Sequence, residues 1–248
     1  MSKAEQIAEG ERIKLGLGDR GPIADLLRTL EERAGLYVSL VQLGSDGLAG
    51  VYQLREELPM VLLNSSHHPV RQRFTLAHEY GHHCLGVETA VDRQIDLHVR
   101  DDSEIAANNF AAEILLPRIG VDWWLQRHND PELDLETLVR LAACYGVSCQ
   151  VALYRLSACQ RIKPNAQRTL QKQIEAGEHT SLARRLRLLQ LVDTLVRERG
   201  REVRMPAAVA RIVLRAYDHG LIDQQAAADR LHVDNQEIIR LSDGDSFV

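Results

Sequence analysis

The segment RQRFTLAHEYGHHCLG, residues 71–86, carries the pattern on which the interpretation of this chain depends. Within it, His78, Glu79 and His82 form the sequence HExxH. Residues four apart lie on the same face of an α-helix, so the two imidazoles can reach one ion. Neutral imidazoles at this spacing suit zinc. The segment therefore predicts a helix that binds one zinc ion per chain.

Glu79 follows directly after the first of these histidines. It lies about 100° around the helix from His78, which places its carboxylate beside the ion without making it a ligand. A carboxylate in this position can take a proton from a metal-bound water. Zinc lowers the pKa of such a water toward ~7, and the hydroxide can attack a peptide carbonyl that the metal polarises. We therefore expect Glu79 to be the general base of a metallo-endopeptidase.

A catalytic zinc site has three protein ligands and one open position. A second helix is expected over about residues 102–116, and it offers Glu104 and Glu113. Because they are nine residues apart, these side chains lie about half a turn from each other and cannot both face the metal. Asn108 lies one turn after Glu104, where its side-chain oxygen can accept a hydrogen bond from a ligating histidine. We predict Glu104 as the third ligand of a gluzincin-like site, supported by Asn108.

Other roles for these residues stay open. Glu104 could serve only to cap its helix, with Asp101 three residues before it in a capping box. His83 and His98 are the fallback ligands, although His83 follows His82 directly and points elsewhere on the helix. A pattern as short as HExxH also recurs by chance on surface helices. Its setting, between predicted strands and a helix with a suitable carboxylate, favours the metal site.

The residues around the HExxH helix predict an α+β fold. Three β-prone runs, over residues 36–43, 48–54 and 58–63, are separated by turn signals and are typical of a small antiparallel sheet. A short amphipathic helix is expected before them, within residues 21–35. We therefore predict a small antiparallel sheet with a zincin-like active-site helix, followed by an all-helical region that resembles helix-turn-helix proteins.

The last predicted strand directly precedes the active-site helix. A peptidase substrate must cross the metal in an extended conformation, and an extended chain is held most readily by pairing with a sheet edge. We expect this strand to be that edge, with Met60, Val61, Leu62 and Leu63 as the substrate-binding residues.

The second half of the chain is expected to contain helices only. Residues 138–156 and 226–241 each resemble a helix-turn-helix, and apolar residues between Leu182 and Val196 form one stripe of a long helix. Pro206 is expected to open a further helix that ends near Gly220. The predicted domains are a zinc metallopeptidase domain over 1–130, helix-turn-helix-like helices packed on it over 131–160, and a C-terminal helical domain over 161–248.

The composition limits the classes of function. With 248 residues and 45% hydrophobic residues, the chain can bury a sizeable core. A formal net charge of −5 argues against a broad surface for nucleic acid or anionic lipid. The polar N-terminus does not look like a secretory signal, and no segment approaches the length of a membrane span. The four cysteines form no CxxC pair, which suits reduced thiols. We expect a cytoplasmic protein.

Two motifs together resemble the ImmA/IrrE family of bacterial zinc metallo-endopeptidases: RQRFTLAHEYGHHCLG and, further on, EIAANNFAAEILLP at residues 104–117. The resemblance covers about residues 20–157. It implies the same ligands, base and supporting asparagine as the pattern analysis. Many members carry an acidic residue where this chain has Ala106, and a methionine where it has Leu116, and neither departure affects a ligand.

The resemblance also implies a substrate. Members of the family typically cut a helix-turn-helix repressor, often encoded nearby, and so release genes for mobile-element transfer, phage induction, or stress and DNA-damage responses. An Xre-type repressor is therefore the expected protein partner, and transcription regulation by proteolysis is the expected role.

Two other functions compete with the peptidase. A DNA-binding regulator would need basic and amide side chains on its recognition helices. The two helix-turn-helix stretches offer only Gln150 and Arg155 in the first and Gln236 and Arg240 in the second. Direct DNA binding is therefore not favoured. A pseudoenzyme that sequesters a repressor through a vestigial site is the other alternative, and the intact HExxH argues against it.

Overall fold

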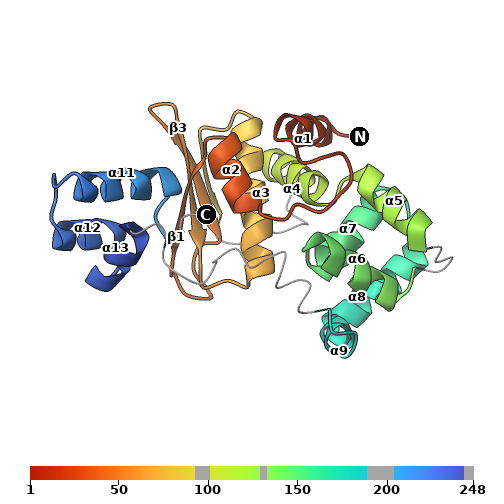
Figure 1. The fold of residues 1–248 in the computed structure, drawn as a ribbon. Coiled ribbons are helices and arrows are strands. Elements are labelled where there is room, and N and C mark those ends of the chain that lie inside the picture. The colour runs from red at the N-terminus through yellow and green to blue at the C-terminus, as the bar shows by residue number, and fades with distance from the viewer. Residues whose placement is uncertain (93–100, 129–132, 189–203, 243–248) are drawn as a thin grey trace.

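The computed structural model describes residues 1–92, 101–128, 133–188 and 204–242. The fold is α+β, as predicted, with a small four-stranded sheet and many helices (Figure 1). The strands are β1 (Tyr37–Val41), β2 (Gly50–Arg55), β3 (Leu58–Asn64) and β4 (Thr89–Asp92). The helices are α1 (Lys3–Lys14), α2 (Leu26–Arg33), α3 (Pro69–Cys84), α4 (Asp102–Leu115), α5 (Arg118–His128), α6 (Leu135–Tyr145), α7 (Cys149–Ala158), α8 (Pro164–Glu175), α9 (Glu178–Arg185), α11 (Ala207–Asp218), α12 (Gln224–Leu231) and α13 (Asn235–Ser242).

The sheet is mixed rather than antiparallel. Its strand order is β1-β3-β2-β4, and β1 runs parallel to β3 while the other two pairings are antiparallel. The β2–β3 hairpin turns at Glu56 and Glu57, both with positive φ, as a tight turn between twisted strands requires. Chain order alone favours pairing of β1 with β2. Instead β3 enters between them, so the expectation of a purely antiparallel sheet is wrong.

The predicted substrate-binding edge is also wrong. Met60, Val61, Leu62 and Leu63 belong to β3, which pairs with β1 on one side and with β2 on the other. The backbone N–H and C=O groups of this strand are therefore paired on both sides within the sheet. It has no free edge on which an extended peptide could add.

Helix α3 crosses the sheet and carries the HExxH residues. It begins at Pro69, where a helix tolerates proline, and ends before Gly86, which has a φ of 78°. All residues from Gln72 to His82 are buried, because the sheet covers one side of the helix and α4 packs on another (Figure 1). At Gly81, a Cβ would lie 3.1 Å from the Phe110 ring, so the missing side chain lets α4 approach closely.

Helix α4 presents its first turns to α3. Asp101 caps it by accepting hydrogen bonds from the backbone N–H groups of Ser103 and Glu104, at 2.9 and 3.3 Å. The helix ends at Leu115, two residues before Pro117. These bounds agree closely with the predicted helix, and its apolar residues are fully buried from Ala107 onward.

Helix α1 packs on α4 and has no counterpart among the predicted elements. Its buried face consists of Ala4, Ala8 and the guanidinium group of Arg12, which donates hydrogen bonds to the carbonyl oxygens of Ile114 and Gly21, at 2.5 and 2.6 Å. A face built from two alanines and one arginine has almost no hydrophobic periodicity. A capping box at Ser2 is the one local signal.

The buried hydrophobic residues of the described ranges form two separate clusters. The larger one joins α1 to α8 and the sheet, and the smaller one lies within α11, α12 and α13. Leu170 of α8 belongs to the larger cluster, so the clusters separate beyond residue 160. The domain bounds stay a prediction. Helix α9 ends at Arg185, and the rest of the predicted stripe to Val196 lies mostly outside the described residues.

The helices of the described ranges are short by the standard of a membrane span. None of them is by itself long and apolar enough to cross a membrane. Helices α6 and α7 meet the criterion only as a pair, and they are bent by 103° at their junction.

Candidate metal centre

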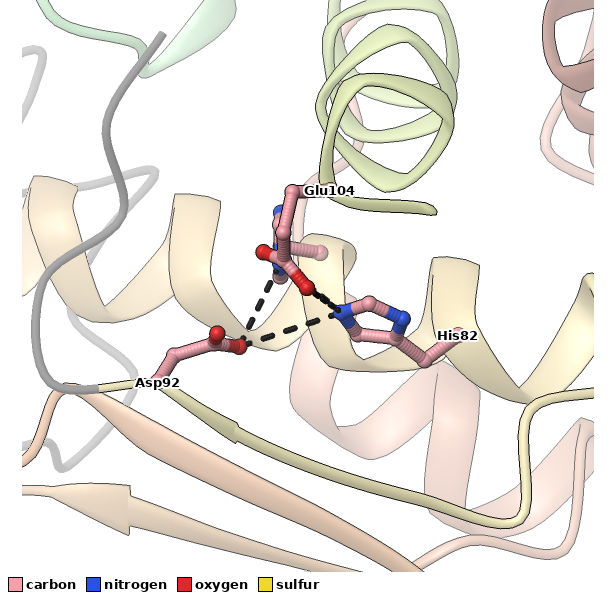
Figure 2. Close-up of side chains that lie close together, drawn as sticks. His82, Asp92 and Glu104 are labelled. Atoms are coloured by element: carbon pink, nitrogen blue, oxygen red, sulfur yellow. Dashed lines mark hydrogen bonds and ion pairs between the residues drawn. The ribbon is translucent and has the colours of Figure 1, made fainter. Parts of the chain in front are cut away.

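Four side chains from three elements meet between α3, α4 and the end of β4. They are His78 and His82 of α3, Glu104 of α4 and Asp92 of β4, and one donor atom of each lies within 4.8 Å of the others. Figure 2 shows the Glu104 and Asp92 carboxylates pointing at the imidazole of His82 from two sides. Of the described residues, this is the one group with the composition and geometry of a metal site.

The distances between the donor atoms are close to those around one tetrahedral metal ion. Bonds of about 2.0–2.2 Å in a tetrahedron place neighbouring donors roughly 3.3–3.6 Å apart. Here the two Nε2 atoms of His78 and His82 are 3.0 Å apart. Glu104 oxygens lie 3.2 Å and 3.3 Å from these nitrogens, and Asp92 Oδ2 lies 3.3 Å and 3.8 Å from them. The residues present can therefore hold one metal ion, and two imidazoles with carboxylates are a donor set that suits zinc.

The charges of the site also fit a cation. Burial lowers the pKa of His78, but hydrogen bonds with Asp92 and Glu104 outweigh burial and raise this pKa to about 9. Burial, followed by repulsion from His78, lowers the pKa of His82. His78 thus binds a proton readily, whereas a second proton on His82 is unfavourable because the two positive charges would lie close together. A metal ion would satisfy both nitrogens and both carboxylates together.

Asn108 orients one of the histidines. Its Oδ1 lies 3.0 Å from Nδ1 of His78, the ring nitrogen that faces away from the donor cluster. If Nδ1 carries the proton and donates it to the amide oxygen, Nε2 is left with a free lone pair for the metal. The residue therefore stands where the sequence predicted a supporting hydrogen bond. His82 Nδ1 is buried without a hydrogen-bond partner among the described residues.

Glu79 lies beside this cluster but outside the donor set. Its side chain is fully buried beside the carboxylate of Asp92, and neither of its oxygens accepts a hydrogen bond from an N–H group in the described parts of the structure. Burial, and then the negative charge of Asp92, raise the pKa of Glu79 well above its ordinary value. Gly50 of β2 packs against it so closely that a Cβ there would lie 2.2 Å from Glu79 Oε1. The carboxyl group is thus confined to one position.

The alternative ligands lie elsewhere. Glu113 is fully buried at the other end of α4, where it is ion-paired with Arg155 and accepts a hydrogen bond from the backbone N–H of Arg118. His83 forms a hydrogen bond of 2.8 Å with the Tyr52 hydroxyl. His98 lies outside the described residues. Neither Glu113 nor His83 reaches the cluster.

Asp92 is the member of the cluster that the sequence analysis missed. It closes β4, a strand of only four residues in a stretch where no strand is predicted. The pairing of Gly50 with Asp92 brings its carboxylate over α3. The only local signal is a weak one, the alternation of exposed Thr89 and Val91 with less exposed Ala90 and Asp92.

Comparison with known proteins points to the same part of the chain. Residues 31–157 match the family model of the IrrE N-terminal-like domain, Peptidase_M78. A protein of Bacillus phage phi105, described as uncharacterized immunity region protein 2, is 28% identical over 107 residues. This match spans 42% of the present chain and 63% of the phage protein, so slightly less than two thirds of that relative is covered.

Proposed function

The chain belongs to the Peptidase_M78 family of proteins with an IrrE N-terminal-like domain, a metallopeptidase family, and we propose that it is a zinc-dependent endopeptidase that cleaves a helix-turn-helix transcriptional repressor. One observation carries the proposal. The donor atoms of two imidazoles and the Glu104 carboxylate lie 3.0–3.3 Å from one another, close enough to bind one ion, and the buried Glu79 side chain lies beside them outside the donor set. This is the arrangement of a hydrolytic zinc site with a separate base.

In this proposal His78, His82 and Glu104 hold the zinc. When bound, zinc supplies Lewis acidity that activates a water and polarises the peptide carbonyl. Asn108 keeps His78 in the tautomer whose Nε2 faces the cluster.

Glu79 moves the proton. A cation held by the neighbouring ligands would favour the ionised form of Glu79, and this carboxylate would take a proton from the attacking water and pass it to the nitrogen of the departing amine. Its burial between α3 and β2, in close contact with Gly50, holds the carboxyl group in one orientation. Gly50 provides the space that this position requires.

The repressor substrate is supported by two facts. The family resemblance implies such a substrate, and the phage relative is described as an immunity region protein. The metal site itself does not distinguish one peptide from another.

The rival function, DNA binding through the helix-turn-helix segments, finds little support. Arg155 of α7 is buried in ion pairs with Glu5 and Glu113, and Gln150 donates to Gln171, so neither side chain is available to read a base. In the second segment, over residues 226–241, acidic side chains outnumber the arginines. Such a surface repels phosphates.

The test uses Glu79→Gln, which keeps the size and polarity of the side chain. The variant should bind zinc like the wild type but lose cleavage of a co-expressed repressor by ~10²-fold or more, as expected for removal of the proton-transfer group. Mass spectrometry of the repressor fragments would identify the cut bond. Glu88→Gln is the matched control, because Glu88 is exposed and lies outside the donor cluster. Full cleavage by the Glu79 variant would reject the mechanism, and a gel shift with DNA would support the rival.

A further inference from the structure

Asp92 reaches the metal centre from the edge of the sheet. Its Oδ2 lies 3.3 Å from His78 Nε2 and 3.8 Å from His82 Nε2, and the side chain is almost completely buried. It adds a fourth donor to the two histidines and Glu104. Structural zinc sites have four protein donors, whereas catalytic sites keep one position open. With Asp92 in place, the donor set is that of a closed site.

Glu79 argues against a site that is always closed. Its side chain is fully buried beside the carboxylate of Asp92, and no N–H group of the described residues donates to it, an arrangement that costs free energy. A purely structural metal site does not need a buried carboxylate that binds no metal. Beside an open coordination position, the same carboxylate can act on a bound water. The closed donor set and the buried base are compatible only if one donor leaves.

The four donors differ in how firmly the fold holds them. His78 and His82 stand in the buried centre of α3, and Glu104 stands on α4, which packs along that helix. Asp92 ends a four-residue edge strand that pairs only with β2 among the described strands. Val91, its neighbour, is 58% exposed and contributes little packing. Short exposed strands open at lower free energy than buried helices, so Asp92 is the donor that can leave.

We propose that Asp92 is a displaceable fourth donor, which closes the metal centre in the resting protein and is replaced when an incoming oxygen ligand takes its position. In the zinc-loaded protein that ligand would be a water or the carbonyl oxygen of an extended peptide. The inference rests on the zinc site of the proposed function but not on peptidase activity. It makes the free protein a latent enzyme, whose opening depends on the last residue of β4.

The experiment measures access to the metal in the full-length protein. Co²⁺ replaces zinc as a visible probe, and acetohydroxamate, a small anion that binds metals through oxygen, is titrated while absorption is recorded. If Asp92 occupies the position in about nine molecules of ten or more, its removal should tighten acetohydroxamate binding by ~10-fold or more. Asp92→Ala and Asp92→Asn should both show this gain and both retain cobalt. Glu88→Ala, which removes an exposed carboxylate from the same segment, should bind acetohydroxamate like the wild type.

Two results would overturn the proposal. Unchanged acetohydroxamate affinity in both Asp92 variants would show that Asp92 does not obstruct the metal. Loss of cobalt from both variants, to the extent seen in Glu104→Ala, would make Asp92 a permanent ligand. The asparagine variant preserves the shape of the side chain, so a folding defect limited to Asp92→Ala does not end the test. A wild type that binds no metal would refute the zinc site itself, whereas normal cobalt titrations without peptide cleavage would refute only the peptidase.

Discussion

The two edges of the sheet make different contacts. At the β1 edge, Leu40 and Arg204 exchange backbone hydrogen bonds of 2.9 and 3.0 Å, and Glu31 forms an ion pair of 2.7 Å with Arg204. Glu31 also accepts a hydrogen bond from the backbone N–H of Ala207, where α11 begins. Figure 1 shows α11, α12 and α13 beside this edge. At the β4 edge, a four-residue strand ends in Asp92 at the metal centre.

The β1 edge contributes to the stability of the fold, whereas the β4 edge contributes to the metal centre. The β1 edge is fixed by paired backbone groups and by a carboxylate that is only 7% exposed, and it joins the C-terminal helices to the rest of the molecule. The β4 edge is a four-residue strand whose outer side pairs with no other described strand, and it carries a metal donor. A disturbance at β1 should therefore loosen the structure, whereas a disturbance near β4 should change the site.

The largest effect is expected from proline in the sheet interior. Val61→Pro removes a backbone donor from β3, which is paired on both sides, and should lower the free energy of unfolding by ~3 kcal/mol or more. Val91→Pro on the β4 edge should cost far less, because edge strands tolerate proline. Urea denaturation of both variants measures the difference. Equal losses would contradict the assignment of β3 to the interior and β4 to the edge.

The next effect concerns the site alone. In Gly50→Ala, the new Cβ would lie 2.2 Å from Glu79 Oε1 and 2.7 Å from Thr75 Cγ2, so the base must move. A displacement of this order should reduce cleavage by ~10²-fold, while zinc content stays normal because no ligand is touched. Gly10→Ala is the control, since a methyl group at Gly10 in α1 would meet no atom within 4 Å. Unimpaired cleavage by Gly50→Ala would mean that the position of Glu79 is not critical.

The smallest effect is expected at the β1 edge. Glu31→Ala removes the ion pair with Arg204 and the cap of α11, and should weaken docking of the C-terminal helices by ~1–3 kcal/mol, the range for unpaired buried partners. Hydrogen exchange at the amides of Leu40 and Arg204 should become faster, with no change in zinc content. Glu32→Ala breaks only an exposed pair with Arg28 and should change exchange at neither amide. Zinc loss in the Glu31 variant would contradict the separation of the two edges.

Local sequence signals predicted the helical half of the site. The four-residue spacing of the histidines, Pro69 before them and Gly86 after them fixed the limits of α3, and an aspartate cap marked the start of α4. The one-turn spacing of Glu104 and Asn108 likewise follows from helix geometry. Each of these features depends on contacts within a few residues along the chain.

The sheet half could not be predicted in the same way. The pairing of β1 with β3, and of β2 with β4, depends on contacts between distant segments, and so do the interior position of Val61 and the arrival of Asp92 at the metal centre. A four-residue strand is too short for its alternation to be distinguished from a loop. Helix α1 could not be predicted for a different reason, because Ala4 and Ala8 form a buried face without large apolar residues.

The most direct test of the central claim is the position of the metal. Anomalous X-ray diffraction at the zinc absorption edge, from crystals of the zinc-loaded protein, should give one peak about 2.0–2.2 Å from the Nε2 atoms of His78 and His82 and from a Glu104 oxygen. Glu79 should lie beside the ion without binding it. A zinc ion bound through Glu79 or Glu113, or no peak between α3 and α4, would contradict the account.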